Sequence, residues 1–407
     1  MKKIIVVILF TVSFCSAYSL SFLAKDGMGL KSYPGDIRSR SMGLTGITLS
    51  GDWTSSIMNP ASTATQRTIV LGVGETVSSL SLTYDRFSGF SADQTSIDAP
   101  YINIIFPLPI KNATLTAYYY APMNSYFQAS FTHEYEHPDG ESGEITDYIG
   151  IDYYKNFNIV GFSGAYALPF HLAVSLGLEC AFGNDKNEYV IINPAFTDTT
   201  TKIVTTNKFL GYAPKFGVYY SYKNFSAGTV YRPSYDVNTS NSYNDTVGPD
   251  FVWEYPAELG IGVGYSHDAL TVSAEYIQEN WSNTSYIGYS DTEDLTRIGI
   301  GGEYLVSMNW SFLSEKEKKV TIPLRVGYYT QEGLYQNGKE SAFSFGTSFK
   351  PFKSGNAAID LMVSFGSREM DLVDMASDGI VSRYSEDFVT FGVSFTTKDL
   401  WFREKKK

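Results

Sequence analysis

The sequence predicts an all-β fold, namely a transmembrane antiparallel β-barrel of about fourteen strands, and three observations support this prediction. Aromatic residues make up 15% of the 407 residues, with 31 Tyr and 27 Phe, and these residues favour strands. Apolar and polar residues alternate with a period of two along most of the chain. Many alternating stretches run for about ten residues, which is enough to cross a bilayer at a tilt, so the barrel is preferred to a soluble sandwich.

The first seventeen residues have the pattern of a secretory signal peptide. Lys2 and Lys3 precede an apolar stretch at 4–14, and a small-residue site ends at Ala17, where we expect cleavage. A lipoprotein signal with Cys15 as the acceptor is the alternative interpretation. Only one cysteine lies beyond this site, so we expect neither a disulfide nor a thiolate metal site in the mature chain. The signal predicts export, and together with the predicted barrel it predicts a location in the bacterial outer membrane.

The stretch at 18–66 differs from the rest of the chain because it is rich in glycine and shows no alternation. It precedes the first predicted strand. We therefore expect it either in the periplasm or inside the barrel.

Alternating segments follow from residue 68 onward. They are expected near 68–87, 101–108, 112–135, 158–167, 171–182, 209–222, 225–233, 253–265, 269–281, 294–306, 320–329, 342–350, 357–367 and 387–397. A further candidate at 145–154 leaves a count of sixteen open. Short links alternate with long polar stretches such as 183–208 and 234–250, as expected for periplasmic turns and external loops. The link at 307–319 is an exception, because it is long where a short turn is expected.

Composition and motifs argue against several function classes. The formal net charge of −12 provides no basic patch for nucleic acid. The four histidines are scattered, and His133 and His137 are four residues apart on a predicted strand end rather than on a helix. No Gly-x-Ser-x-Gly nucleophile motif occurs. We therefore expect a protein that is not an enzyme and that has no cofactor and no metal.

Several short motifs occur in an order that resembles one known family. They stand at 40–47, 51–53, 57–62, 215–220, 228–233, 255–264, 274–281, 297–304 and 323–328. Their order resembles that of the FadL-type outer-membrane transporters of fatty acids and other hydrophobic compounds, over roughly residues 35–397. The chain departs from that family at Trp53 and Ser62, and its C-terminus does not end on a strand aromatic.

The resemblance implies that 18–66 forms a hatch inside a barrel at 67–397, followed by a periplasmic tail at 398–407. The residues that match the family's hatch motif are Gly43, Asp52, Asn59, Pro60 and Ala61. We expect Asn59 and Pro60 to form a turn and Asp52 to accept hydrogen bonds from nearby backbone donors.

The resemblance also implies a monomeric, plugged barrel that takes up a hydrophobic small molecule, such as a long-chain fatty acid, and releases it sideways into outer-membrane lipid. The candidate contacts for a ligand carboxylate are the lumen-facing cations Lys215, Arg297 and Arg325. The structural alternative is that these cations pair with lumen-facing carboxylates, namely Glu179, Glu275, Glu303 or Asp360.

The third predicted strand contains a proline, Pro122, which has no N–H to donate to a neighbouring strand. In a barrel the lost hydrogen bond is either replaced by another contact or the wall opens locally. The resemblance implies a lateral opening at a kink in this strand. We therefore expect the opening at Tyr120, Ala121, Pro122 and Met123. The alternative is that Pro122 lies in an ordinary periplasmic turn between two strands.

A second function class stays open beside transport. A FadL-type barrel can act as a protein-binding or secretion-accessory factor of the outer membrane, and the polar stretches at 183–208 and 234–250 offer surfaces for a partner.

Overall fold

The computed structural model describes most of the chain after residue 30. The described ranges are 31–51, 57–84, 91–136, 144–193, 199–244, 246–284, 292–310, 318–351, 355–374 and 380–400. The expected signal peptide, Asp52 and the end of the expected tail lie outside these residues. Within them, no helix has the length and apolar character needed to span a membrane.

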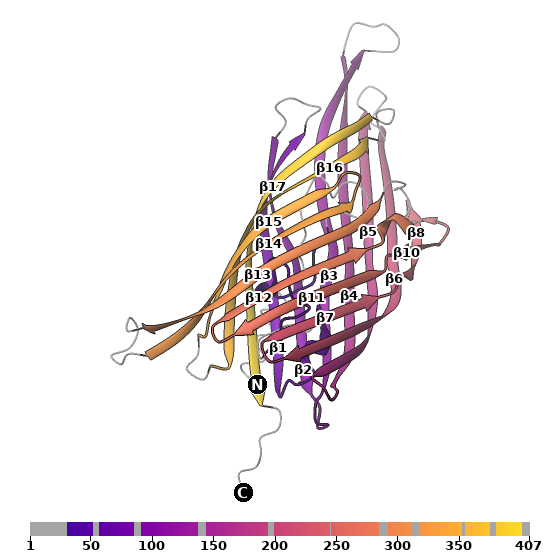
Figure 1. Cartoon of the computed structure of the whole chain (residues 1–407). Helices are drawn as coiled ribbons and strands as arrows, with labels where there is room; N and C mark the ends of the chain where they lie inside the picture. Colours follow the sequence, from indigo (N-terminus) through magenta and orange to yellow (C-terminus); the bar gives the residue numbers. More distant parts are fainter. Residues whose placement is uncertain are drawn as a thin grey trace.

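Nearly all of the regular structure is strand (Figure 1). The strands are β1 (Thr68–Tyr84), β2 (Ser91–Pro107), β3 (Ala113–Glu136), β4 (Glu144–Ala167), β5 (Leu172–Asn193), β6 (Thr199–Tyr222), β7 (Phe225–Arg232), β8 (Tyr235–Tyr243), β9 (Thr246–Val247), β10 (Phe251–Tyr255), β11 (Glu258–His267), β12 (Leu270–Glu279), β13 (Glu293–Trp310), β14 (Lys318–Leu334), β15 (Lys339–Phe349), β16 (Ala357–Asp374) and β17 (Ile380–Leu400). The short helices are α2 (Ile37–Arg40), η2 (Pro60–Thr63) and η3 (Trp281–Asn283).

The strands form one closed antiparallel barrel. Its first strand, β1, pairs with the last strand, β17, along its whole length. β7 and β8 follow each other beside β6, and they pair with β11 and β10 respectively, so each couple is one barrel strand interrupted by a short break. Because β9 pairs only with β8, the described strands make a fourteen-strand barrel. The predicted fold class and strand number are confirmed.

The structure removes the sixteen-strand alternative, because 145–154 and 158–167 belong to the single strand β4. The long polar stretches are also more ordered than expected. Much of 183–208 continues β5 and β6, which stay paired up to Asn193 and Thr199. A ladder of backbone hydrogen bonds does not need apolar side chains, so polar composition alone was a poor indicator of loops. Figure 1 shows β3 and β4 extending beyond their neighbours at the upper end.

Apolar side chains face outward on the barrel and polar ones face inward. On β13, Ile298 and Ile300 are 57% and 51% exposed, whereas the intervening Gly299 and the preceding Arg297 are buried. The same division occurs on β14, where Leu324 and Val326 are exposed and Arg325 is buried. This arrangement is the reverse of a soluble sandwich, which buries its apolar face.

Residues 31–51 and 57–66, which we call the N-terminal segment, contact inward-facing side chains on widely separated strands. Arg38 pairs with Glu303 of β13, and the Thr63 hydroxyl lies 3.2 Å from that of Thr114 on β3. Asn59 donates to the Val218 carbonyl of β6. The segment therefore touches opposite parts of the wall from the inner side.

Glycines on the inner face let the backbone of this segment approach the wall. A Cβ at Gly301 of β13 would lie 2.1 Å from the Met42 carbonyl oxygen, and one at Gly327 of β14 would lie 1.9 Å from the Gly43 nitrogen. Gly43 itself has a φ of +69° and packs against backbone atoms of both strands. Gly299 and Gly301 of β13, with Gly327 of β14, thus provide space for the N-terminal segment.

Replacing Gly301 with alanine should destabilise the folded barrel by about 1–3 kcal/mol, because the added methyl overlaps the Met42 carbonyl group. The matched control is G302A, since a Cβ at the neighbouring Gly302 has its nearest contact 3.7 Å away. Urea unfolding of both variants in detergent micelles measures the difference. Equal midpoints for G301A and G302A would contradict this account of the glycines.

Candidate functional site

The first group of buried charges surrounds Glu179 on β5. Its carboxylate is 3.1 Å from Lys215 Nζ and 3.5 Å from an Arg232 nitrogen, and it accepts a hydrogen bond from the Tyr118 hydroxyl at 2.9 Å. Lys215 also donates to the Ile57 carbonyl of the N-terminal segment at 3.0 Å. Lys215 is therefore fully engaged in an ion pair and a backbone contact.

The second group surrounds Arg325 on β14. Its guanidinium contacts Glu303 and Asp360, each at 2.7 Å. Glu303 is shared with Arg38 of α2, whose nitrogens lie 2.8 and 3.1 Å from its two oxygens. For Arg325, as for Lys215, the structure thus matches the structural alternative of pairing with lumen-facing carboxylates.

Arg297 on β13 differs from the other two predicted cations. It is 3% exposed, yet its Nη2 has no hydrogen-bond partner among the described residues, and its guanidinium lies 4.3 Å from the centre of the Tyr33 ring. The Tyr33 hydroxyl and the side-chain oxygen of Gln331, which is opposite Arg297 on β14, also lack partners there. Burying unpaired polar groups is costly, so these three side chains keep unsatisfied hydrogen-bonding capacity.

Glu275 on β12 holds the backbone of the N-terminal segment. One of its carboxylate oxygens accepts N–H bonds from Gly46 at 2.7 Å, Ile47 at 2.5 Å and Thr48 at 3.4 Å. The other oxygen is buried without a hydrogen-bond partner in the described structure. A single carboxylate thus anchors three successive residues to the wall.

An aromatic cluster fills another part of the buried interior. We use this name for the rings of Phe157, Phe209, Tyr235, Trp253, Tyr255 and Trp281, which belong to a larger buried cluster. The Phe157 and Tyr255 rings are stacked with centroids 5.4 Å apart, and Tyr255 contacts Trp281 at the same separation. These rings offer large apolar surfaces within the barrel.

Lys31 connects the aromatic cluster with Tyr33. It pairs with Glu279, and its Nζ lies 5.7 Å from the ring centroids of both Tyr33 and Trp281. Trp281 in turn donates its indole N–H to Glu279 at 2.8 Å. Burial lowers the pKa of Lys31, and the charge of Glu279 opposes this effect.

The seam between β2 and β3 is short. The two strands pair only from Ile102–Tyr119 down to Pro107–Thr114, although β3 continues to Glu136. Pro122 therefore lies within a continuous strand and not in a turn, and the pairing of β3 with β4 shifts between Tyr120 and Met123.

Backbone groups of the N-terminal segment cover the end of this seam. The Ser32 N–H donates to the Pro122 carbonyl at 2.7 Å, and Lys31 forms an isolated antiparallel bridge with Met123. Tyr120, Ala121 and Met123 are all buried. The four predicted residues of the opening thus lie together where β2 and β3 part.

The predicted motif around Asn59 forms a compact turn. Asn59 caps η2 by accepting the Ala61 N–H at 3.1 Å, and Pro60 occupies the first position of that helix. The Asn59 amide also donates to the carbonyls of Ile47 and Val218. Asn59 therefore connects two parts of the N-terminal segment with the wall.

Sequence reasoning missed Lys31, Tyr33, Arg38 and Gln331. The first three lie in a segment without periodicity, so no pattern indicated which way they face. Glu275 was predicted as a counter-charge for a cation, whereas the structure shows it accepting backbone N–H groups. Only its inward position in the alternating stretch of β12 could have been inferred.

Comparisons with known proteins place the fold. A Pseudomonas aeruginosa FadL homologue has a TM-score of 0.63 at 12% identity, over 91% of this chain and 99% of that one. The Pseudomonas putida toluene transporter TodX has a TM-score of 0.57 at 15% identity, with 92% and 100% covered. The Ralstonia pickettii toluene transporter TbuX has a TM-score of 0.55 at 14% identity, over 93% of this chain and 100% of that one. At these identities the likeness establishes the fold alone.

Sequence comparison identifies a different family name. No curated protein matches the chain significantly. A family model described as BamG matches residues 1–407, which is the whole chain. The resemblance to FadL-type proteins is thus confirmed for the fold, and the chain belongs to the BamG family.

Proposed function

We propose that this protein is an outer-membrane barrel that takes up hydrophobic molecules with an acidic head group, such as long-chain fatty acids. The observation behind this proposal is the buried Arg297 guanidinium, whose Nη2 has no partner among the described residues. The fold shared with a FadL homologue and two toluene transporters supports it. The outward apolar band supports a position in a membrane.

In this proposal the ligand carboxylate binds Arg297 and the Tyr33 hydroxyl, because a guanidinium and a hydroxyl both donate to a carboxylate. The hydrocarbon chain lies toward Trp281 and the aromatic cluster, to which Lys31 connects Tyr33. Each buried methylene contributes about 0.8 kcal/mol, so a long chain has ample driving force to leave water.

The N-terminal segment acts as the hatch in this proposal, and the seam between β2 and β3 is the exit. The contacts of the segment around the inner wall support its role as a hatch. The pairing of β2 with β3 ends at Ile102–Tyr119, and this supports an exit at that seam. Ligand that displaces Lys31 from Trp281 also disturbs the Ser32–Pro122 hydrogen bond, which couples binding to opening.

A second candidate function is that of a protein-binding accessory factor in the outer membrane. The family model that matches bears a name different from those of the transporters that share the fold. The structural observation that favours a protein partner is Glu75 of β1, a carboxylate that lies opposite the 43% exposed Val393 of β17.

The variant R297Q tests the head-group site. It should weaken binding of palmitate by roughly 10- to 100-fold, because it removes a hydrogen bond to a charged group worth about 1.5–3 kcal/mol. Binding of hexadecanol, which has the same chain without a carboxylate, should be unchanged. Isothermal titration of purified barrel measures both ligands, with the exposed Lys208→Gln variant as the matched control. An equal loss for the acid and the alcohol would assign Arg297 a structural role.

The variant E275A tests the hatch. Loss of the carboxylate leaves the N–H groups of residues 46–48 without their acceptor, so the N-terminal segment should detach from β12. We expect a stability loss on the order of 3 kcal/mol and a raised ion conductance in planar bilayers. The control is D268N in an exposed turn. Reduced stability with unchanged conductance would argue against a plug.

Cysteines at positions 100 and 121 test the exit, because these positions continue the register of the last β2–β3 pair. The background is C180S, since Cys180 is a free thiol. The oxidised protein should remain folded and lose uptake of a fluorescent fatty acid into cells, and reduction should restore it. Full uptake with the disulfide formed would exclude this seam as the exit.

A further inference from the structure

A row of inward-facing polar side chains crosses five neighbouring strands of the barrel. The row consists of Arg297 on β13, Gln331 on β14, Glu340 on β15, Arg368 on β16 and Glu386 on β17, and each member lies opposite the next in the strand register. Gln331 is the uncharged member of this row. It therefore separates Arg297 from the first carboxylate.

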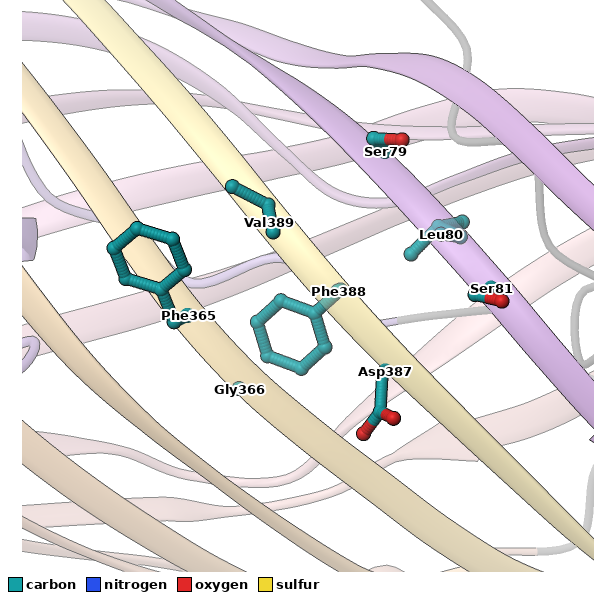
Figure 2. A pocket seen from close by; sticks show the side chains of 8 residues that line it. All are labelled: Ser79, Leu80, Ser81, Phe365, Gly366, Asp387, Phe388 and Val389. Carbon is teal, nitrogen blue, oxygen red and sulfur yellow. The ribbon is translucent and has the colours of Figure 1, made fainter.

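The charges on β15, β16 and β17 pair with one another. Arg368 Nε lies 3.5 Å from a Glu340 oxygen and 3.8 Å from a Glu386 oxygen, and Tyr329 donates its hydroxyl to Glu340 at 2.6 Å. The Arg368 guanidinium also lies 4.6 Å from the centre of the Phe388 ring. Figure 2 shows that ring among the residues that line a cavity of about 330 Å³. Arg368 is thus held between the two carboxylates of the row.

Arg297 and Gln331 are direct neighbours that do not bond to each other. Their Cβ atoms are about 4.5–5.5 Å apart, because the two residues are opposite on β13 and β14. Arg297 Nη2 can donate and Gln331 Oε1 can accept, yet both atoms are buried without a hydrogen-bond partner among the described residues. The side chains are 3% and 7% exposed, so both are shielded from bulk water.

The three unpaired atoms of this site differ in the partner that each requires. Arg297 Nη2 only donates, the Tyr33 hydroxyl donates and accepts, and Gln331 Oε1 only accepts. A carboxylate has no hydrogen to donate, so a simple fatty acid satisfies the first two atoms and leaves the Gln331 oxygen buried and unpaired. An unsatisfied buried acceptor lowers affinity, because its desolvation is not compensated.

We propose that the site selects acids that carry a hydroxyl or amide N–H close to the carboxylate, such as 3-hydroxy fatty acids or N-acyl amino acids. The carboxylate accepts from Arg297 and Tyr33, and the nearby O–H or N–H donates to Gln331. The donor has to be near the carboxylate because Gln331 is the direct neighbour of Arg297. This inference rests on the proposed uptake of acidic hydrophobic ligands and defines the head group that the site prefers.

Isothermal titration of the purified full-length barrel with matched ligands tests the preference. We expect 3-hydroxypalmitate and N-myristoylglycine each to bind about tenfold more tightly than palmitate, because either one satisfies the Gln331 oxygen. The control ligand is 16-hydroxypalmitate, which has the same atoms as 3-hydroxypalmitate with the hydroxyl at the far end of the chain. It should bind no more tightly than palmitate. A gain for only one of the two donor-bearing acids would assign the preference to hydroxyl or amide.

The variant Q331M then tests the residue. Methionine has a similar length and no oxygen acceptor, so the ratio of 3-hydroxypalmitate to palmitate affinity should fall from about ten to about one. The matched control is Q278M on the neighbouring strand β12, where Gln278 alternates with the buried Ile277 and Glu279 and so faces outward. This variant should keep the ratio. Heat-modifiable migration on gels shows that both variants are folded.

Three results would overturn the inference while leaving uptake of fatty acids in place. They are equal affinities for palmitate and both donor-bearing acids, an equal gain for 16-hydroxypalmitate, and a ratio that persists in Q331M. Failure of all of these acids to bind would instead remove the proposed function and this inference together.

Discussion

Charges enclosed in a lumen and shielded from bulk water need partners inside the barrel, and this requirement organises the interior of the protein. The Glu303 carboxylate forms ion pairs with both Arg325 of the wall and Arg38 of the N-terminal segment. The Glu179 carboxylate likewise forms ion pairs with both Lys215 and Arg232. Removing one member of a buried pair costs about 3–5 kcal/mol, so the N-terminal segment and the wall stabilise each other.

The ion pairs between the N-terminal segment and the wall can form because the backbone of the segment lies close to the backbone of the wall strands. Inward glycines such as Gly301 and Gly327 let the chain around Met42 and Gly43 lie directly on β13 and β14. From that position Arg38 reaches Glu303, and the N–H groups of residues 46–48 reach Glu275. The small inner side chains and the buried carboxylates are therefore parts of one arrangement.

The wall could be predicted from the sequence because each strand residue faces either outward or inward, and this choice is visible as local alternation. The stretch containing Ile298, Ile300 and Arg297 shows this directly. The polar extensions of β5 and β6 could not be predicted, because outside the apolar band neither face of a strand requires apolar residues.

The candidate site was less predictable than the wall. Alternation placed Lys215, Arg297 and Arg325 on the inner face, but it could not distinguish Arg297, whose Nη2 lacks a partner, from the two cations that are paired. That distinction depends on residues far away in sequence and on a segment without periodicity. Tyr33 and Lys31 belong to that segment, so their contacts with Arg297 and Trp281 became visible only in three dimensions.

The pairing of Arg38 with Glu303 also bears on the order of assembly, since the two residues are 265 positions apart. A chain that has been exported only as far as β12 contains Arg38 but lacks the carboxylate of β13 and the rest of its group on β14 and β16. Without β13, β14 and β16, the N-terminal segment lacks the wall residues that hold Arg38 in place. Completion of the last strands and placement of the first residues are thus linked, because Arg38 lacks the Glu303 carboxylate until β13 is present.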